Sequence, residues 1–207
     1  MARKLSLLLT IASLLGLALA PGALAVGIGN HRVVSQPNRA ATSVPQGGSL
    51  IASPAACPGQ EDLAASTEAQ QQTMRCMTDF ARQQAGVGVL SDSQQLDLSA
   101  QEKSADVLNC DSFSHEACGR EFSYWMRQSG YMSSSCWHVG ENLAWGTGEY
   151  GTVRSIFRAW MRSPEHRRNV LGDYSELGIN LATGDLEGET GTHVWTEHFG
   201  SRCEAQQ

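Results

Sequence analysis

The stretch 152-TVRSIFRAWMRSPEHRRNVL-171 decides the fold, because it encodes two consecutive helices with a sharp boundary between them. In its first half, apolar side chains recur with the spacing i, i+3, i+4, i+7 and i+8. These residues are Val153, Ile156, Phe157, Trp160 and Met161. This spacing is typical of a helix that packs one face on a core, and Thr152 is placed to cap its first turn.

Ser163 and Pro164 separate the two helices. Ser163 is a suitable N-cap, and Pro164 fits the first helical position, where a backbone N–H is not needed. Glu165 then lies in the first turn, where the helix dipole favours a negative charge. Helix formation alone therefore explains these residues. Helix formation does not explain His166. This histidine could face a metal, a ligand or only neighbouring side chains.

Segments with helical periodicity precede segments that alternate like strands. Further helices are predicted over residues 61–84, 91–109 and 120–129. Strands are predicted over 176–182 and 192–200, the latter with Trp195 and Phe199 on one face. The acidic, glycine-rich segment 183–191 predicts a hairpin loop between them. Helices followed by antiparallel strands indicate an α+β domain built in layers.

The first 25 residues have the pattern of a secretory signal peptide. Basic residues near the start precede the apolar stretch Leu5–Ala20, and Ala23-Leu24-Ala25 forms a small-x-small cleavage site. An uncleaved anchor helix is the alternative, but the apolar stretch is shorter than the roughly 20 residues of a spanning helix. We expect export, no membrane span after cleavage, a Ser/Pro/Gly/Ala-rich linker over 26–56 and one folded domain over 57–207.

The charge balance argues against two classes of partner. Removal of residues 1–25 leaves 21 acidic residues against 13 of the 15 basic ones, a formal charge of −8. An acidic chain without a basic run is a poor candidate for binding nucleic acid or an anionic membrane surface. We expect neither partner, and a monomer.

Six cysteines follow the signal segment, namely Cys57, Cys76, Cys110, Cys118, Cys136 and Cys203. In an exported chain an even number indicates disulfides, and six cysteines allow 15 pairings. The spacing contains no C-x₂-C pair, so it does not resemble a zinc ribbon. We favour the two locally closest pairs, Cys57–Cys76 and Cys110–Cys118, which leaves Cys136–Cys203. A catalytic free thiol is the alternative.

Four motifs together resemble a known family. They are "FSHEACG" (113–119), "GENLAWG" (140–146), "AWMRSPEHRRNVL" (159–171) and "ELGIN…HVWTEHFG" (176–200). In this order they are similar to the CAP superfamily of cysteine-rich secretory, antigen 5 and pathogenesis-related 1 proteins, in its bacterial secreted branch. The resemblance implies a three-layer α-β-α sandwich with a central antiparallel sheet, here stapled by disulfides.

The resemblance also implies a cleft lined by histidines and acidic residues. His115, Glu141 and His166 match three members of that set. The second glutamate of the family falls at Ser163, so this sequence departs from the four-residue pattern. Glu176 could return a carboxylate to the cleft, although pairing with Arg167 or Arg168 is the simpler expectation.

Three chemistries remain open for this cleft. His115 and His166 are candidate ligands for a divalent cation such as zinc, with Glu141 as a further oxygen donor. The same side chains could instead form a polar cluster that only orders the surrounding loops. Glu141 acting with a histidine in acid–base hydrolysis is the third.

The function that the resemblance implies is binding rather than catalysis. Family members are mostly secreted binding or signalling proteins, some associated with sterols or lipids and some with divalent cations. We expect a binding module for a small apolar ligand, a cell-envelope component or a protein, with a metal-assisted extracellular hydrolase as the alternative. The histidines His138, His193 and His198 are expected at the surface or near strand edges, without a function.

Overall fold

The structure, a computed structural model, describes residues 49–202. The expected signal segment, most of the expected linker and Cys203 lie outside the described residues.

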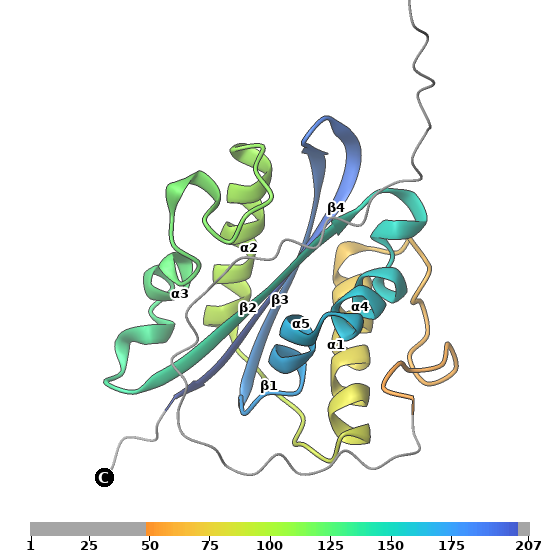
Figure 1. Cartoon of the computed structure of the whole chain (residues 1–207), viewed down its shortest axis with the longest axis horizontal. Helices are drawn as coiled ribbons and strands as arrows, with labels where there is room; N and C mark the ends of the chain where they lie inside the picture. The colour runs from red at the N-terminus through yellow and green to blue at the C-terminus, as the bar shows by residue number, and fades with distance from the viewer. Residues whose placement is uncertain (1–48, 203–207) are drawn as a thin grey trace, which may run out of the picture.

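A four-stranded sheet forms the middle layer of the domain (Figure 1). Its strands are β1 (Ser91–Asp92), β2 (Trp137–Gly146), β3 (Glu176–Leu186) and β4 (Glu189–Arg202), in the order β1-β3-β4-β2. The three long strands pair antiparallel, as predicted, whereas the two-residue strand β1 pairs parallel to β3 at one edge. The sheet is therefore mixed, and its three long strands form the central antiparallel sheet that was expected.

Helices cover both faces of the sheet (Figure 1). On one face lie α2 (Gln94–Asn109) and α3 (Tyr124–Gln128). On the other lie α1 (Thr67–Gln84), α4 (Val153–Arg162) and α5 (Pro164–Val170). Three short 3₁₀ helices connect these elements, η1 (Ala117–Gly119), η2 (Tyr131–Ser133) and η3 (Gly148–Gly151). The expected three-layer α-β-α sandwich is confirmed.

The boundary between α4 and α5 forms as the sequence predicts. Thr152 Oγ1 accepts a hydrogen bond from the backbone N–H of Ser155 at 3.3 Å, which caps α4. Ser163 ends α4 and caps α5, where its Oγ accepts from the backbone N–H of His166 at 3.5 Å. Pro164 occupies the first turn of α5. Because the cap fixes this turn, the direction of the His166 side chain follows from local sequence.

The largest core lies between the sheet and the layer of α1, α4 and α5. The five predicted apolar residues of α4 are all buried there, and Trp195 and Phe199 meet them from β4. On the other face, Gly178 of β3 lies so close to α2 that a Cβ atom would collide with the backbone of Leu96 and Asp97. The absence of a side chain at Gly178 therefore lets α2 pack directly on the sheet.

Disulfides staple the domain on both sides of the sheet. Cys57 is bonded to Cys76, and Cys110 to Cys118, which are the two local pairs expected from the spacing. Cys136 is also disulfide-bonded. None of the cysteines within residues 49–202 is a free thiol, so the alternative of a catalytic cysteine is wrong for those five.

Candidate functional site

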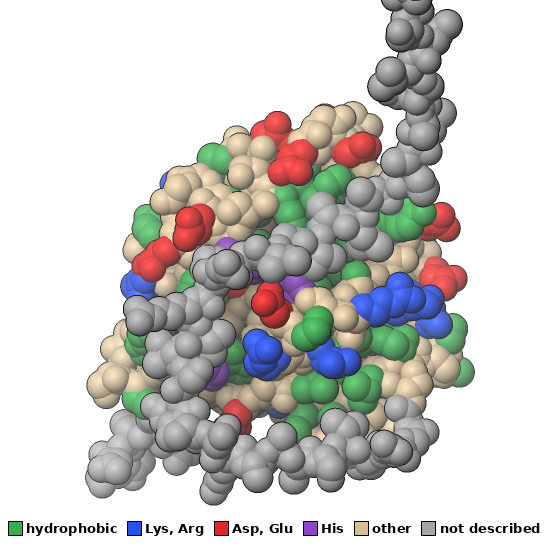
Figure 2. Space-filling view, viewed as in Figure 1, with side chains coloured by type: hydrophobic (Ala, Val, Ile, Leu, Met, Phe, Trp, Pro, Cys, Tyr) green, Lys and Arg blue, Asp and Glu red, His purple; other side chains and the backbone are tan. Residues whose placement is uncertain are grey.

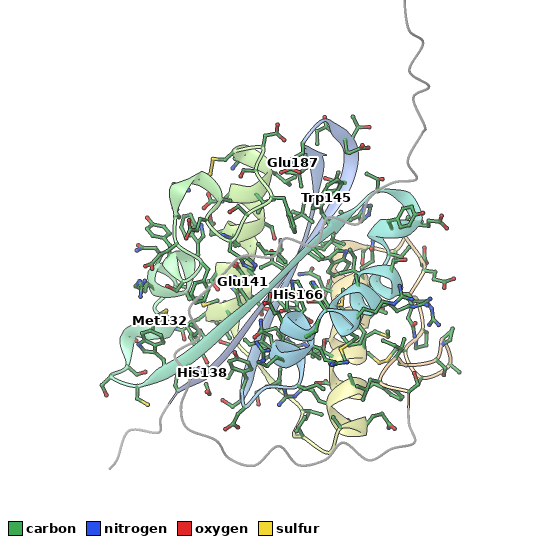
Figure 3. All side chains as sticks on the ribbon, viewed as in Figure 1. Met132, His138, Glu141, Trp145, His166 and Glu187 are labelled. Carbon is green, nitrogen blue, oxygen red and sulfur yellow. A yellow bond between two sulfur atoms is a disulfide. The ribbon has the colours of Figure 1, made fainter. Side chains whose placement is uncertain are left out.

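The candidate site lies at the middle of β2, which forms the edge of the sheet opposite β1 (Figure 3). Glu141 is part of this strand, His115 comes from the loop between α2 and η1, and His166 belongs to α5 on the other face. Asn169 of α5 donates to the backbone carbonyl of Glu141 at 3.0 Å and so ties the helix to the strand. The structure therefore brings together three of the four residues predicted for the cleft.

Glu141 is the centre of the site and is buried, with 1% of its side chain exposed. His115 Nδ1 lies 2.5 Å from Oε1, and His198 Nε2 lies 2.8 Å from Oε2. The ammonium group of Lys103 is 3.9 Å from Oε1 and donates to the backbone carbonyl of His115 at 2.5 Å. Both carboxylate oxygens thus have a hydrogen-bond donor, and a buried cation lies beside them.

These neighbours hold Glu141 in its ionised form. Burial alone would raise the pKa of Glu141, but hydrogen bonds from His115 and His198 and the charge of Lys103 outweigh it and lower the pKa to about 2. Burial likewise lowers the pKa of Lys103, against the charge of Glu141, which raises it. A general base needs a pKa near the working pH, so Glu141 is a poor base and a stable acceptor.

His198 was expected near the surface, and this prediction is wrong. Its side chain is fully buried, with Nε2 on Glu141 and Nδ1 2.6 Å from the Oγ of Ser99 in α2. A signal was present, because Trp195 and Phe199 were assigned to one face of the strand. His198 must then point to the opposite face, which α2 also buries. His198 lies next to Glu141 because β2 and β4 pair in a register that puts the two residues opposite each other. The sequence pattern does not predict that register.

His166 is buried on the other side of β2. Its Nδ1 atom is enclosed and has no hydrogen-bond partner in residues 49–202. Burial, and secondarily the charge of His115, lower the pKa of His166 to about 4. The imidazole is therefore neutral at neutral pH, and when Nε2 carries the ring proton, Nδ1 can accept a hydrogen bond or coordinate a cation.

A second buried carboxylate, Glu197, lies on the face that packs on α1, and no sequence pattern singled it out. It is fully buried, and its Oε1 accepts a hydrogen bond from the hydroxyl of Thr78 at 2.8 Å. Oε2 has no hydrogen-bond partner among the described residues. Burial raises the pKa of Glu197 to about 7, although the Thr78 hydrogen bond opposes the shift. The pKa of Glu197 is thus raised on one face of the sheet, whereas the pKa of Glu141 is lowered on the other.

The structure does not bring Glu176 into the cleft. Its carboxylate accepts a hydrogen bond from the hydroxyl of Tyr131 at 2.6 Å and forms an ion pair with Arg202 at 2.7 Å. The predicted alternative partners, Arg167 and Arg168, are not the ones found. The physical reason is register, since the start of β3 lies opposite the C-terminal end of β4, where Arg202 follows the paired residue Gly200.

The donor set limits which metal this site fits. The described residues contain no group of three or more His, Cys, Asp or Glu side chains placed to hold a metal ion. Glu141 already has a donor on each oxygen, and Ser163 caps α5. The residues therefore do not fit a catalytic zinc site with three protein ligands. They fit at most a cation held by the imidazoles of His115 and His166.

A separate cavity lies beside α4, away from the histidines. It is open to solvent, has a volume of about 360 Å³ and is lined by Leu50, Ile51, Arg158, Met161 and Arg162. Figure 2 shows Lys and Arg side chains gathered over α4 and α5. The cavity therefore combines an apolar lining with two cationic groups one helical turn apart.

Comparison with known proteins identifies the family. Residues 64–199 match the cysteine-rich secretory protein family, CAP, and the chain belongs to it. The uncharacterized protein YkwD of Bacillus subtilis is 29% identical over 124 residues, which cover 59% of this chain and 44% of that protein. The chain thus spans less than half the length of this curated relative.

Solved structures agree with this fold. An outer surface protein of Borrelia burgdorferi has a TM-score of 0.56 at 16% identity, over 67% of this chain and 97% of that protein. An extracellular protein containing an SCP domain from Bacillus anthracis has a TM-score of 0.52 at 19% identity, over 64% and 40%. None of the helices within residues 49–202 is long and apolar enough to cross a membrane.

Proposed function

We propose that this chain is an exported, non-catalytic binding domain whose cleft binds a ligand between the imidazoles of His115 and His166. Export is supported by the predicted signal peptide, by the disulfides and by relatives described as extracellular or outer surface proteins. The observation that carries the binding proposal is the enclosed Nδ1 atom of His166, which has no hydrogen-bond partner in the described chain. Buried polar atoms without a partner are rare, and a bound ligand is one way to satisfy them.

Zinc is the ligand class that a pair of imidazoles suits best. His115 and His166 would hold it, and the cation would leave coordination positions for a ligand or for water. Binding without hydrolysis follows from Glu141, because a carboxylate with a pKa of about 2 and two engaged oxygens does not activate water. The metal-assisted hydrolase remains the alternative outcome of the test.

The test is a calorimetric titration of the full chain with zinc, after dialysis against a chelator. We expect one zinc per chain, with uptake lost in His115→Ala and in His166→Ala. His138→Ala is the matched control, because that histidine is exposed and stacks on Tyr174 outside the cleft. Uptake that survives both cleft substitutions, or no uptake at all, refutes the proposal. If the two variants lose only melting temperature, the cleft is a structural polar cluster. Zinc-dependent peptide hydrolysis in the wild type would favour the hydrolase.

The cavity beside α4 supports a second candidate, binding of an anionic amphiphile. An apolar lining suits a hydrocarbon chain, and Arg158 with Arg162 suits a carboxylate or phosphate head. Binding of a medium-chain fatty acid should exceed that of the matching alcohol, and the double change Arg158→Gln and Arg162→Gln should remove the difference. Equal binding of acid and alcohol to the wild type would count against this candidate.

A further inference from the structure

A continuous chain of hydrogen bonds runs from α2 to the cleft. Ser99 Oγ lies 2.6 Å from His198 Nδ1, and His198 Nε2 lies 2.8 Å from Glu141 Oε2. The other oxygen of Glu141 lies 2.5 Å from His115 Nδ1. Ser99, His198 and Glu141 are all buried, whereas 12% of the His115 side chain is exposed. The chain therefore starts in the interior and ends at the cleft.

The protons along this chain are fixed by the number of donors available. An ionised carboxylate only accepts, so His198 must carry a proton on Nε2 and His115 a proton on Nδ1. Ser99 has one hydroxyl proton and two acceptors in reach, His198 Nδ1 and the carbonyl of Leu96 at 2.9 Å. When the hydroxyl donates to His198 Nδ1, that nitrogen carries no proton, and the neutral ring keeps its proton on Nε2, which faces Glu141.

Lys103 strengthens the same arrangement from the other side. Its ammonium group lies beside Glu141 and donates to the backbone carbonyl of His115. The negative charge of Glu141 is thus compensated within the protein. A cation arriving at the cleft would find Glu141 already neutralised and its oxygens engaged.

We propose that Ser99 and His198 are positioning residues for His115: through Glu141 they fix the His115 proton on Nδ1 and make Nε2 the ring nitrogen that carries the lone pair. This inference rests on the proposed binding function and deepens it, because it makes Glu141 the orienting group and not a ligand. Carboxylates that orient a metal-binding histidine are a general device, and loss of such partners typically weakens metal affinity about 10- to 100-fold. Here the orienting carboxylate is itself oriented by a buried histidine and serine.

The first measurement is nitrogen-15 NMR of the histidine rings in the metal-free protein, which shows which ring nitrogen carries the proton. We expect His115 to hold its proton on Nδ1 in the wild type. In His198→Leu the carboxylate loses one donor and its fixed orientation, so His115 should populate both tautomers. His198→Gln can still donate to Glu141 and should restore the single tautomer.

Ser99→Ala provides a milder change with a matched control. Ser104→Ala removes another buried serine of α2, whose hydroxyl lies 2.8 Å from Thr196 of β4 and does not touch Glu141. We expect Ser99→Ala to shift the His115 tautomers toward a mixture and Ser104→Ala to leave them unchanged. If His198→Leu does not fold, this pair alone decides.

The second measurement is zinc affinity, which should fall about 10- to 100-fold in His198→Leu and remain near the wild-type value in His198→Gln. The positioning role is overturned if His115 keeps the Nδ1–H tautomer alone in both Ser99→Ala and His198→Leu. It is equally overturned if Ser104→Ala shifts the tautomers as much as Ser99→Ala. A wild type that binds no zinc but shows the expected tautomer changes would sink the proposed function and leave the positioning role standing.

Discussion

Replacement of Glu197 by glutamine should make the protein more stable above neutral pH. The carboxyl group is fully buried, and its pKa rises from 4.5 to about 7 because burial disfavours the charge. A group whose folded-state pKa is raised contributes stability below its unfolded pKa and loses it as the pH rises through the folded value. Stability should therefore fall between about pH 4.5 and pH 7.

The size of this effect follows from the pKa difference. A shift of about 2.5 units at roughly 1.4 kcal/mol per unit gives about 3 kcal/mol lost by pH 8. Glutamine has nearly the same shape, carries no charge and can keep the bond from Thr78. We expect Glu197→Gln to match the wild type near pH 4 and to exceed it by up to about 3 kcal/mol at pH 8.

Urea unfolding from pH 4 to pH 8 measures this difference directly. Subtraction of the two curves removes the titration of all other groups, so the difference reports Glu197 alone. Parallel curves for the wild type and Glu197→Gln would refute the reasoning. Thr78→Val serves as a control for the hydrogen bond. It should destabilise the protein by about 1 kcal/mol near pH 4, where Glu197 is protonated and no ionised group is involved.

The remaining predictions concern stability at acidic pH, the role of Glu176 and the core face of α4. Glu141 has the opposite shift, from 4.5 to about 2, so its stabilising contribution should be lost as the pH falls from about 4.5 to 2, and Glu141→Gln should abolish that dependence in acid unfolding curves. Glu176→Gln should leave zinc uptake unchanged and cost about 1 kcal/mol or less in urea unfolding, since its partner Arg202 is exposed; a change in zinc uptake would return Glu176 to the cleft. Phe157→Ala in α4 should cost about 3–5 kcal/mol in the same assay, whereas Arg158→Ala, the exposed neighbour, should cost about 0.5 kcal/mol or less; equal losses would contradict the assigned core face.

The α4–α5 segment shows which structural features can be predicted from residues that are neighbours along the chain. The apolar periodicity from Val153 to Met161 and the cap at Ser163 depend only on neighbours along the chain, and both are confirmed. Strand β2 is absent from the predicted elements, because residues 140–146 are buried on both faces and show no alternation. Without that strand, the sequence could not place Glu141 beside a particular residue of β4.

The site divides in the same way. The resemblance supplied His115, Glu141 and His166, which the structure brings to one edge of the sheet. The sequence did not identify three further residues of the site, namely His198, Ser99 and Lys103, because each makes its contact with a residue far away in the sequence. Residue type alone does not distinguish a buried, hydrogen-bonded histidine or lysine from one at the surface. Glu176 was misplaced for the same reason, since its partner depends on where β4 ends.

The register of β2 against β4 has a consequence for how this chain can change during evolution. Glu141 lies opposite His198, and Asn142 lies opposite Glu197. An inserted or deleted residue that slid one strand by one position could place Glu197 directly opposite Glu141, on the same face and without water to screen the two charges. Length variation among descendants of this sequence should therefore collect in the hairpin and the connecting loops, while the spacing from Gly140 to Gly146 and from Thr192 to Gly200 stays constant.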